Sequence, residues 1–176
     1  MSNSYKNWKY LFLFCFGLFA AAAFCMKWME PDFMQNGKLF TIIGLEISYP
    51  KEKVISVLSG LNDHVKTILR YHLSFDFAFM AGVYPGIAAL CMMARMKCTG
   101  KLIKGILLTC AVLQAVAWGC DIAENCFLFG WIRNPEIGTE FGLYHVIVAA
   151  KWIIALGAVI VAIPFVVRKR KMMLKS

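Results

Sequence analysis

Four long apolar blocks dominate this sequence of 176 residues. The blocks cover residues 10–29, 73–94, 102–131 and 143–167. Each is long enough to cross the hydrocarbon core of a bilayer as a helix, which takes about 20 residues. Because the backbone in lipid must satisfy its hydrogen bonds internally, the pattern predicts an all-α integral membrane protein. We expect a four-helix transmembrane bundle that forms a single membrane domain over residues 1–176.

The net charge of +9 is distributed unevenly along the chain. Cations without neighbouring acids occupy the start of the chain, the loop between the second and third blocks, and the C-terminal tail: Lys6 and Lys9; Arg95, Lys97, Lys101 and Lys104; Arg168, Lys169, Arg170, Lys171 and Lys175. Residues 27–72 and 131–142 mix acids with bases. The positive-inside rule therefore places both termini in the cytoplasm of a multi-pass protein of the cell (inner) membrane. The basic tail then faces anionic headgroups, so its charge indicates a lipid bilayer as partner and no nucleic acid.

The connector between the first two blocks, residues 30–72, contains two local signals. Asn36-Gly37 lies between short polar–apolar stretches, which favours a β-hairpin turn. Pro50 fits the start of a helix. An amphipathic pattern follows it, interrupted at residues 60–62, with apolar residues at helical spacing: Val54, Leu58, Leu61, Val65 and Leu69. Such a helix either lies on the outer membrane surface or caps the bundle, and capping is the simpler interpretation.

A polar stripe interrupts the third apolar block. Gln114, Trp118, Asp121 and Asn125 follow 4-3-4 spacing, so they share one face of a helix, and Glu124 lies at the edge of this face. Ionisable side chains are costly inside a bilayer and usually have a function there. The stripe is therefore the first place to look for a site.

A helix rises about 1.5 Å per residue, so the depth of each residue in the membrane can be calculated. Polar groups of the other blocks lie at depths similar to that of the stripe. Lys151 of the fourth block is nearly level with Asp121, and Asp76 and Tyr84 of the second block lie in the same outer half. We expect Lys151 to be the counter-ion of Asp121 or Glu124. The inner halves of the blocks are apolar, which predicts a pocket open to the outside and closed inside. An excess of acids over the single base suits proton handling, cation binding or general acid–base chemistry.

The same residues also have a structural interpretation. Asp121, Glu124 and Lys151 would then form an ion pair that fixes the third block against the fourth. Asn125 and Gln114 would form hydrogen bonds between helices.

Two residues of the second block have their own structural alternatives. Asp76 would be an acid in the first turn of a helix, stabilised by the helix dipole. Tyr84 would donate a hydrogen bond to a carbonyl freed by Pro85. Gly82 and Gly86 form a GxxxG pair, which favours close packing of another helix more than dimerisation.

The sequence indicates no metal and no cofactor. Its three histidines, His64, His72 and His145, lie outside the blocks or at a block end and are not paired for metal or haem ligation. The seven cysteines include no CxxC and none in the outer loops, which disfavours a disulfide oxidoreductase. Phosphate loops, HExxH and nucleophile elbows are absent as well.

Several short segments carry a resemblance to other proteins. They are Leu45-Glu46, Arg70-Tyr71-His72-Leu73-Ser74-Phe75-Asp76-Phe77, Tyr84, Trp118 with Asp121-Ile122-Ala123-Glu124-Asn125, and Ala150-Lys151-Trp152. Over residues 45–155 the chain resembles a group of uncharacterised bacterial four-span membrane proteins in which a DxxEN motif ends the third span. The resemblance implies a prokaryotic membrane and the same fold, and it brings no known activity.

Three functions stay open at this stage. The first is binding or proton-linked transport of a small or amphipathic ligand in the pocket. Asp121 and Glu124 would bind a cation or proton with Lys151 as counter-ion, and Asn125, Gln114 and Tyr84 would orient the ligand. A transporter this small would need to form a homo-oligomer. The second is a membrane enzyme that acts on a lipid-like substrate, with Asp121 or Glu124 as acid–base and Lys151 stabilising negative charge. The third is a structural or partner-binding subunit.

Overall fold

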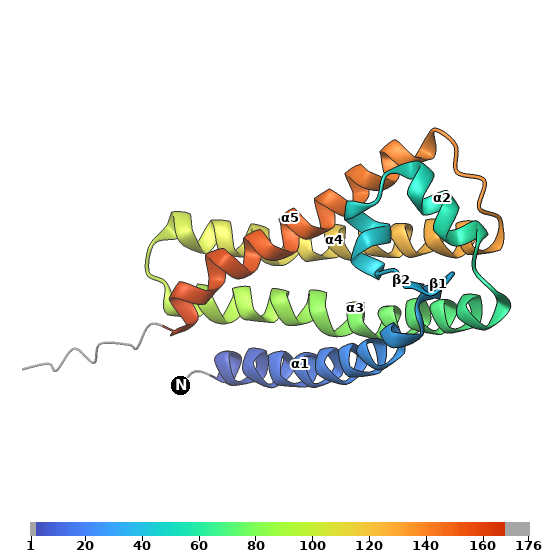
Figure 1. Ribbon diagram of the computed structural model, residues 1–176. Helices are drawn as coiled ribbons and strands as arrows, with labels where there is room; N and C mark the ends of the chain where they lie inside the picture. The colour runs from blue at the N-terminus through green and yellow to red at the C-terminus, as the bar shows by residue number, and fades with distance from the viewer. Residues whose placement is uncertain (1–2, 168–176) are drawn as a thin grey trace, which may run out of the picture.

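The computed structural model describes residues 3–167; Met1, Ser2 and residues 168–176, which include the basic tail, lie outside the described residues. Four long helices form the body of the protein: α1 (Asn3–Met29), α3 (Asp63–Lys97), α4 (Lys101–Arg133) and α5 (Glu140–Val167) (Figure 1). Each helix is long and apolar enough to cross a membrane. The predicted all-α architecture with four candidate spans is confirmed. The helices extend beyond the apolar blocks because their polar ends continue the helical backbone.

The central helix of the bundle is α3, which packs against α1, α4 and α5, while α4 also packs against α5. Lys97 at the end of α3 donates to the carbonyl of Val166 on α5 and lies 5.9 Å from the ring of Tyr5 on α1. The start of α1, the α3–α4 loop and the end of α5 therefore share one end of the bundle, on the left in Figure 1. We call this the terminal end and the opposite one the connector end.

The connector folds into five short elements at the connector end. They are η1 (Glu30–Asp32), β1 (Met34–Gln35), β2 (Lys38–Leu39), the π-helical η2 (Gly44–Ser48) and α2 (Lys51–Ser59). The two strands pair antiparallel. The residues between them, Asn36 and Gly37, have φ values of 50° and 74°. Two successive left-handed residues are what a two-residue hairpin turn requires, so the predicted hairpin is confirmed.

The predicted interruption of the amphipathic segment is also confirmed. Helix α2 ends at Ser59, and Asn62 caps the start of α3 by accepting a hydrogen bond from the Val65 amide at 2.9 Å. A side-chain acceptor at this position satisfies one of the free amides of a helix start. All five apolar residues of the pattern, from Val54 to Leu69, are buried.

The largest apolar cluster lies at the connector end. It joins Phe33 and Leu45 of the connector and Leu58 of α2 to Leu128 of α4 and Tyr144 of α5. A separate cluster at the terminal end consists of small or aliphatic side chains of α3, the α3–α4 loop, α4 and α5: Cys91, Ala94, Cys98, Leu107, Ala158 and Ala162. The connector thus covers the end of the bundle, which is the predicted capping arrangement.

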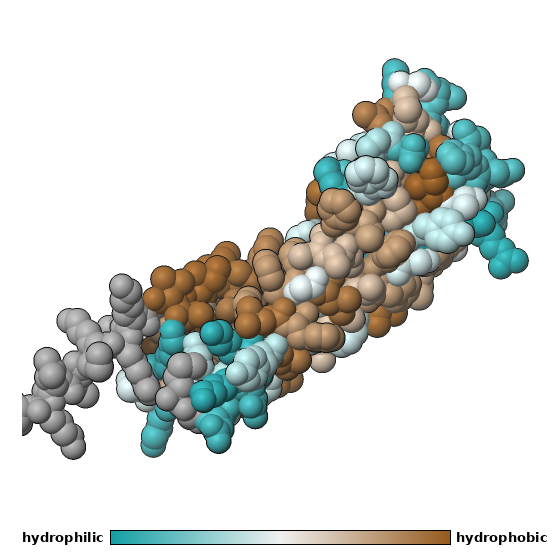
Figure 2. Space-filling model, turned by 90° about the horizontal axis from the view of Figure 1, so that it is seen from below, coloured by the Kyte–Doolittle hydropathy of each residue, from teal (hydrophilic) through white to brown (hydrophobic). Residues whose placement is uncertain are grey.

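Exposed apolar side chains surround the middle of the bundle. Phe14 on α1, Val112 on α4 and Ile160 on α5 are 72%, 63% and 70% exposed, respectively. Figure 2 shows hydrophobic residues over the middle of the molecule and hydrophilic residues toward both ends. A broad apolar belt between polar ends matches four helices that could cross a membrane.

Helix α1 approaches α3 closely at two glycines. A Cβ atom on Gly82 would lie 2.6 Å from the Phe19 nitrogen and 2.8 Å from the Cys15 oxygen. A Cβ on Gly86 would lie 3.2 Å from the Cys15 Cβ. The GxxxG pair therefore serves close packing of α1, which is the interpretation that the sequence favoured.

Candidate functional site

A buried lysine forms the centre of the charged groups. Lys151 on α5 is 6% exposed, and its Nζ lies 2.6 Å from Asp121 Oδ1 and 2.6 Å from Glu124 Oε2, both on α4. The expected pairing of Lys151 with these carboxylates is confirmed. Glu124 is fully buried, and neither of its oxygens accepts a well-oriented hydrogen bond from the described residues. The ammonium charge is therefore its main stabilising contact.

A third carboxylate comes from the connector. Glu46 of η2 places its Oε2 3.7 Å from Lys151 Nζ. The hydroxyl of Tyr144 donates to the Leu45 carbonyl at 3.4 Å and holds η2 against α5. Burial raises the pKa of the Glu46 carboxyl, and Lys151 opposes this effect. Sequence reasoning did not place Glu46 among the candidates, although an acid within the apolar stretch before Pro50 was a usable signal.

Tyr84 on α3 completes the contacts of Asp121. Its hydroxyl donates to Asp121 Oδ2 at 2.7 Å, and its ring stacks on Trp118 with 6.4 Å between the centroids. The expectation that Tyr84 bonds to a carbonyl freed by Pro85 is therefore wrong, because the carboxylate is the acceptor. Each oxygen of Asp121 has a donor, one on α3 and one on α5.

Asp76 and Asn125 form a second polar contact between α3 and α4. Asn125 Nδ2 donates to Asp76 Oδ2 at 2.7 Å and approaches the Leu73 carbonyl at 3.5 Å. The alternative that Asp76 lies in a first helical turn is wrong, since α3 begins at Asp63. Asp76 lies well inside that helix, and a side-chain amide rather than the helix dipole stabilises it.

Gln114 does not join the other polar groups. Its Nε2 donates to the Cys110 carbonyl of its own helix at 3.0 Å, and its buried Oε1 has no partner among the described residues. The expected interhelical hydrogen bond is therefore not formed through its amide nitrogen. The stripe is a real face of α4, but only its second half reaches the charged groups.

A cavity of about 570 Å³ lies beside the charged groups. The charged and polar residues of its wall include Lys27, Glu30, Glu46, His72, Asp76, Tyr84, Asp121 and Lys151. Its apolar wall includes side chains of α1, α3 and α5: Phe19, Ala23, Phe79, Val83, Ala155 and Leu156. The other three candidates, Glu124, Asn125 and Gln114, do not line it. The volume and the few polar groups at one side are typical of small-molecule sites.

His72 is a cavity residue that sequence reasoning set aside. It is 3% exposed, its ring meets Phe33 edge-on at 5.2 Å between centroids, and its Nδ1 has no hydrogen-bond partner among the described residues. His72 precedes Asp76 by four residues on α3, so both face the cavity. This spacing was the signal that could have identified it.

The residues that the structure describes include no cluster of three or more His, Cys, Asp or Glu side chains arranged to hold a metal ion. The seven cysteines, all within the described residues, are free thiols. The described side chains at the cavity offer carboxylates, two ammonium groups, a phenol and an imidazole.

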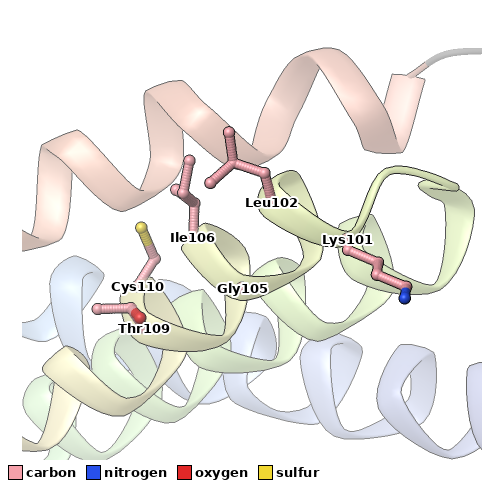
Figure 3. A pocket seen from close by; sticks show the side chains of 6 residues that line it. All are labelled: Lys101, Leu102, Gly105, Ile106, Thr109 and Cys110. Carbon is pink, nitrogen blue, oxygen red and sulfur yellow. The ribbon is translucent and has the colours of Figure 1, made fainter.

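A second hollow, of about 560 Å³, provides a comparison. Its labelled lining side chains, including Leu102, Ile106, Thr109 and Cys110, all come from α4 (Figure 3). It contains no acid, and Lys101 is its only charged lining residue. A hollow on one helix with no converging polar groups lacks the features of a specific site.

Comparisons with known proteins do not assign a function: no family model matches the chain, and neither curated proteins nor solved structures show a match. The geometry of the cavity is therefore the basis on which a function can be inferred.

Proposed function

We propose that this protein is an integral membrane protein that binds a small or amphipathic ligand in the cavity between α1, α3 and α5. The observation that carries the proposal is the composition of the cavity wall, which is charged on one side and apolar on the other. Glu46, Asp76 and Lys151 would meet the polar part of the ligand. The apolar part would contact Phe79 and Val83.

The proposed orientation puts the terminal end in the cytoplasm. The cations of the α3–α4 loop support this, because positively charged loops stay on the cytoplasmic side. The connector end then faces outward, and the cavity, which Glu46 and Ile43 of the connector help to line, opens in the outer half of the membrane.

Binding is favoured over a through-pore. The cluster of Cys91, Ala94, Leu107 and Ala158 packs α3, α4 and α5 together at the terminal end without a charged member. Transport would require this cluster to separate and would involve a second copy of the chain, so binding is the simpler proposal. The flanking helices suggest the route of entry: α1 and α5 both pack on α3, and an amphiphile would enter between them from the lipid.

Filling the cavity is expected to expel the ligand. In Ala155→Phe the added ring would fill the space beside the apolar wall of the cavity. We expect the affinity for a co-purifying amphiphile to fall about tenfold, which corresponds to about 1.4 kcal/mol of binding free energy. Native mass spectrometry of protein extracted in mild detergent measures this as the loss of a bound mass. Thr109→Phe is the matched control, because it adds a ring to the second hollow of similar volume.

Two results would contradict the proposal. One is an unchanged bound mass in a folded Ala155→Phe variant. The other is wild-type protein that carries no amphiphile and takes up none from added lipid.

A further inference from the structure

The polar wall of the cavity contains an imidazole to which no described group donates a hydrogen bond. The Nδ1 atom of His72 is buried and unpartnered among the described residues, yet His72 lines an open cavity. A neutral imidazole has one acceptor nitrogen, and an acceptor without a partner costs about 1–3 kcal/mol, so a ligand that donates to the ring nitrogen facing the cavity would remove this cost. The ligand head therefore needs an N–H or O–H group.

The charges next to His72 favour a cation. Asp76 accepts a hydrogen bond from Asn125 through Oδ2, and no other described side chain donates to it. Glu46 has Lys151 at 3.7 Å, but that ammonium lies closer to Asp121 and Glu124. The carboxylates of Asp76 and Glu46, both in the cavity wall, can therefore bind an additional positive charge.

An anionic head would find no free partner. The cations that line the cavity are Lys27 and Lys151. Lys27 pairs with Glu30, and Lys151 pairs with Asp121 and Glu124. An acid placed beside Glu46 and Asp76 would instead be repelled.

The apolar wall extends from the polar groups along three helices. Phe79, Val83 and Ile87 line it from α3, and Leu156 and Val159 line it from α5. The spacing of four residues on α3 places its side chains in a row along one face, which suits a hydrocarbon chain.

We propose that the ligand is a cationic amphiphile with a protonated primary amine, whose head binds His72, Asp76 and Glu46 and whose hydrocarbon chain lies along α3 between α1 and α5. This inference rests on the proposed function and specifies its ligand class. A primary ammonium supplies both the positive charge and the N–H donors, of which one would reach the acceptor nitrogen of His72. A quaternary ammonium supplies only the charge.

The test compares three soluble probes with the same chain: n-octylamine, octyltrimethylammonium and octanoate. Titration calorimetry of the full chain in phosphatidylcholine nanodiscs, with empty nanodiscs subtracted, gives the affinity of each. We expect saturable binding of octylamine and no binding of octanoate. Octyltrimethylammonium should bind about tenfold more weakly than octylamine, because it cannot donate a hydrogen bond to His72. This comparison on the wild-type chain needs no variant to fold.

Two variants localise the head group. His72→Phe keeps a ring in place and should weaken octylamine to the level of octyltrimethylammonium, while leaving the latter unchanged. Asp76→Asn should weaken both. The matched controls are His64→Phe and Glu136→Gln, at an exposed histidine and an exposed carboxylate, which should change neither.

The outcomes separate this inference from the proposed function. Binding of octanoate as tight as that of octylamine, or equal binding of the two amines, would overturn the amine assignment and leave a ligand-binding cavity. Absence of octylamine binding, while Ala155→Phe still expels a native amphiphile, would do the same. Failure of every probe together with an unchanged bound mass in Ala155→Phe would overturn both.

Discussion

Replacing Lys151 with methionine is expected to destabilise the folded protein by about 3–5 kcal/mol, the usual cost of removing one partner of a buried ion pair. The ammonium lies 2.6 Å from both Asp121 and Glu124 and 3.7 Å from Glu46. Without it, the buried carboxylates of Asp121 and Glu124 and the partly buried one of Glu46 would face one another in a low dielectric. The free energy of unfolding in mixed micelles, followed by the loss of helical circular dichroism, measures the effect.

A second substitution tests the cause of this loss. Glu124→Gln in the Lys151→Met background removes one of the uncompensated charges and should restore part of the stability. Lys27→Met is the matched control, since its pair with Glu30 is exposed at the Lys27 side and is worth about 0–1 kcal/mol. Equal stability of Lys151→Met and Lys27→Met would mean that the buried pair does not hold α4 against α5.

Gly82→Ala is expected to destabilise the protein by about 1–3 kcal/mol, the range for overpacking a close contact. The new Cβ would lie 2.6 Å from the Phe19 nitrogen and 2.8 Å from the Cys15 oxygen. Both are backbone atoms, so no side-chain rotation can relieve the clash. Helix α1 must therefore move away from α3. Because Phe19 also lines the cavity, the same substitution should weaken ligand binding. Unfolding in mixed micelles and the bound mass report the two effects.

Gly17 on α1 and Gly86 on α3 are the controls for this substitution. A Cβ on Gly17 meets nothing within 4 Å, so Gly17→Ala should be neutral or should stabilise the helix by up to about 1 kcal/mol. Gly86→Ala should fall between the two, because its only near contact is the Cys15 side chain at 3.2 Å. If Gly82→Ala proves as stable as Gly17→Ala, the close packing of α1 on α3 is not as described.

Much of the fold follows from local sequence signals. The four helices follow from apolar length, the hairpin from Asn36-Gly37, and the start of α3 from the break before Asp63. The pairing of Lys151 with Asp121 could be predicted as well, because a constant rise per residue puts residues of neighbouring antiparallel helices at comparable depth. These are properties of single helices or of helix direction.

The remaining features of the site depend on how helices rotate and how the connector folds. Gln114 shares the stripe with Asp121, yet it bonds within its own helix, because only the part of α4 near Lys151 faces polar partners. Glu46 reaches the cluster only because η2 packs under Tyr144. His72 faces the cavity because the rotation of α3 turns its side chain there. Periodicity indicates which residues share a helix face, as His72 and Asp76 do, but it does not specify which partner that face contacts.

The most direct measurement of the central claim is an electron-density map of the protein crystallised from a lipidic mesophase. The proposed function predicts elongated density in the cavity, beside Phe79 and Val83, and the ligand inference predicts a polar end about 3 Å from a ring nitrogen of His72. A cavity that holds only water, or that is closed by its own side chains, would contradict the account. The charged groups would then serve only to fix the helices.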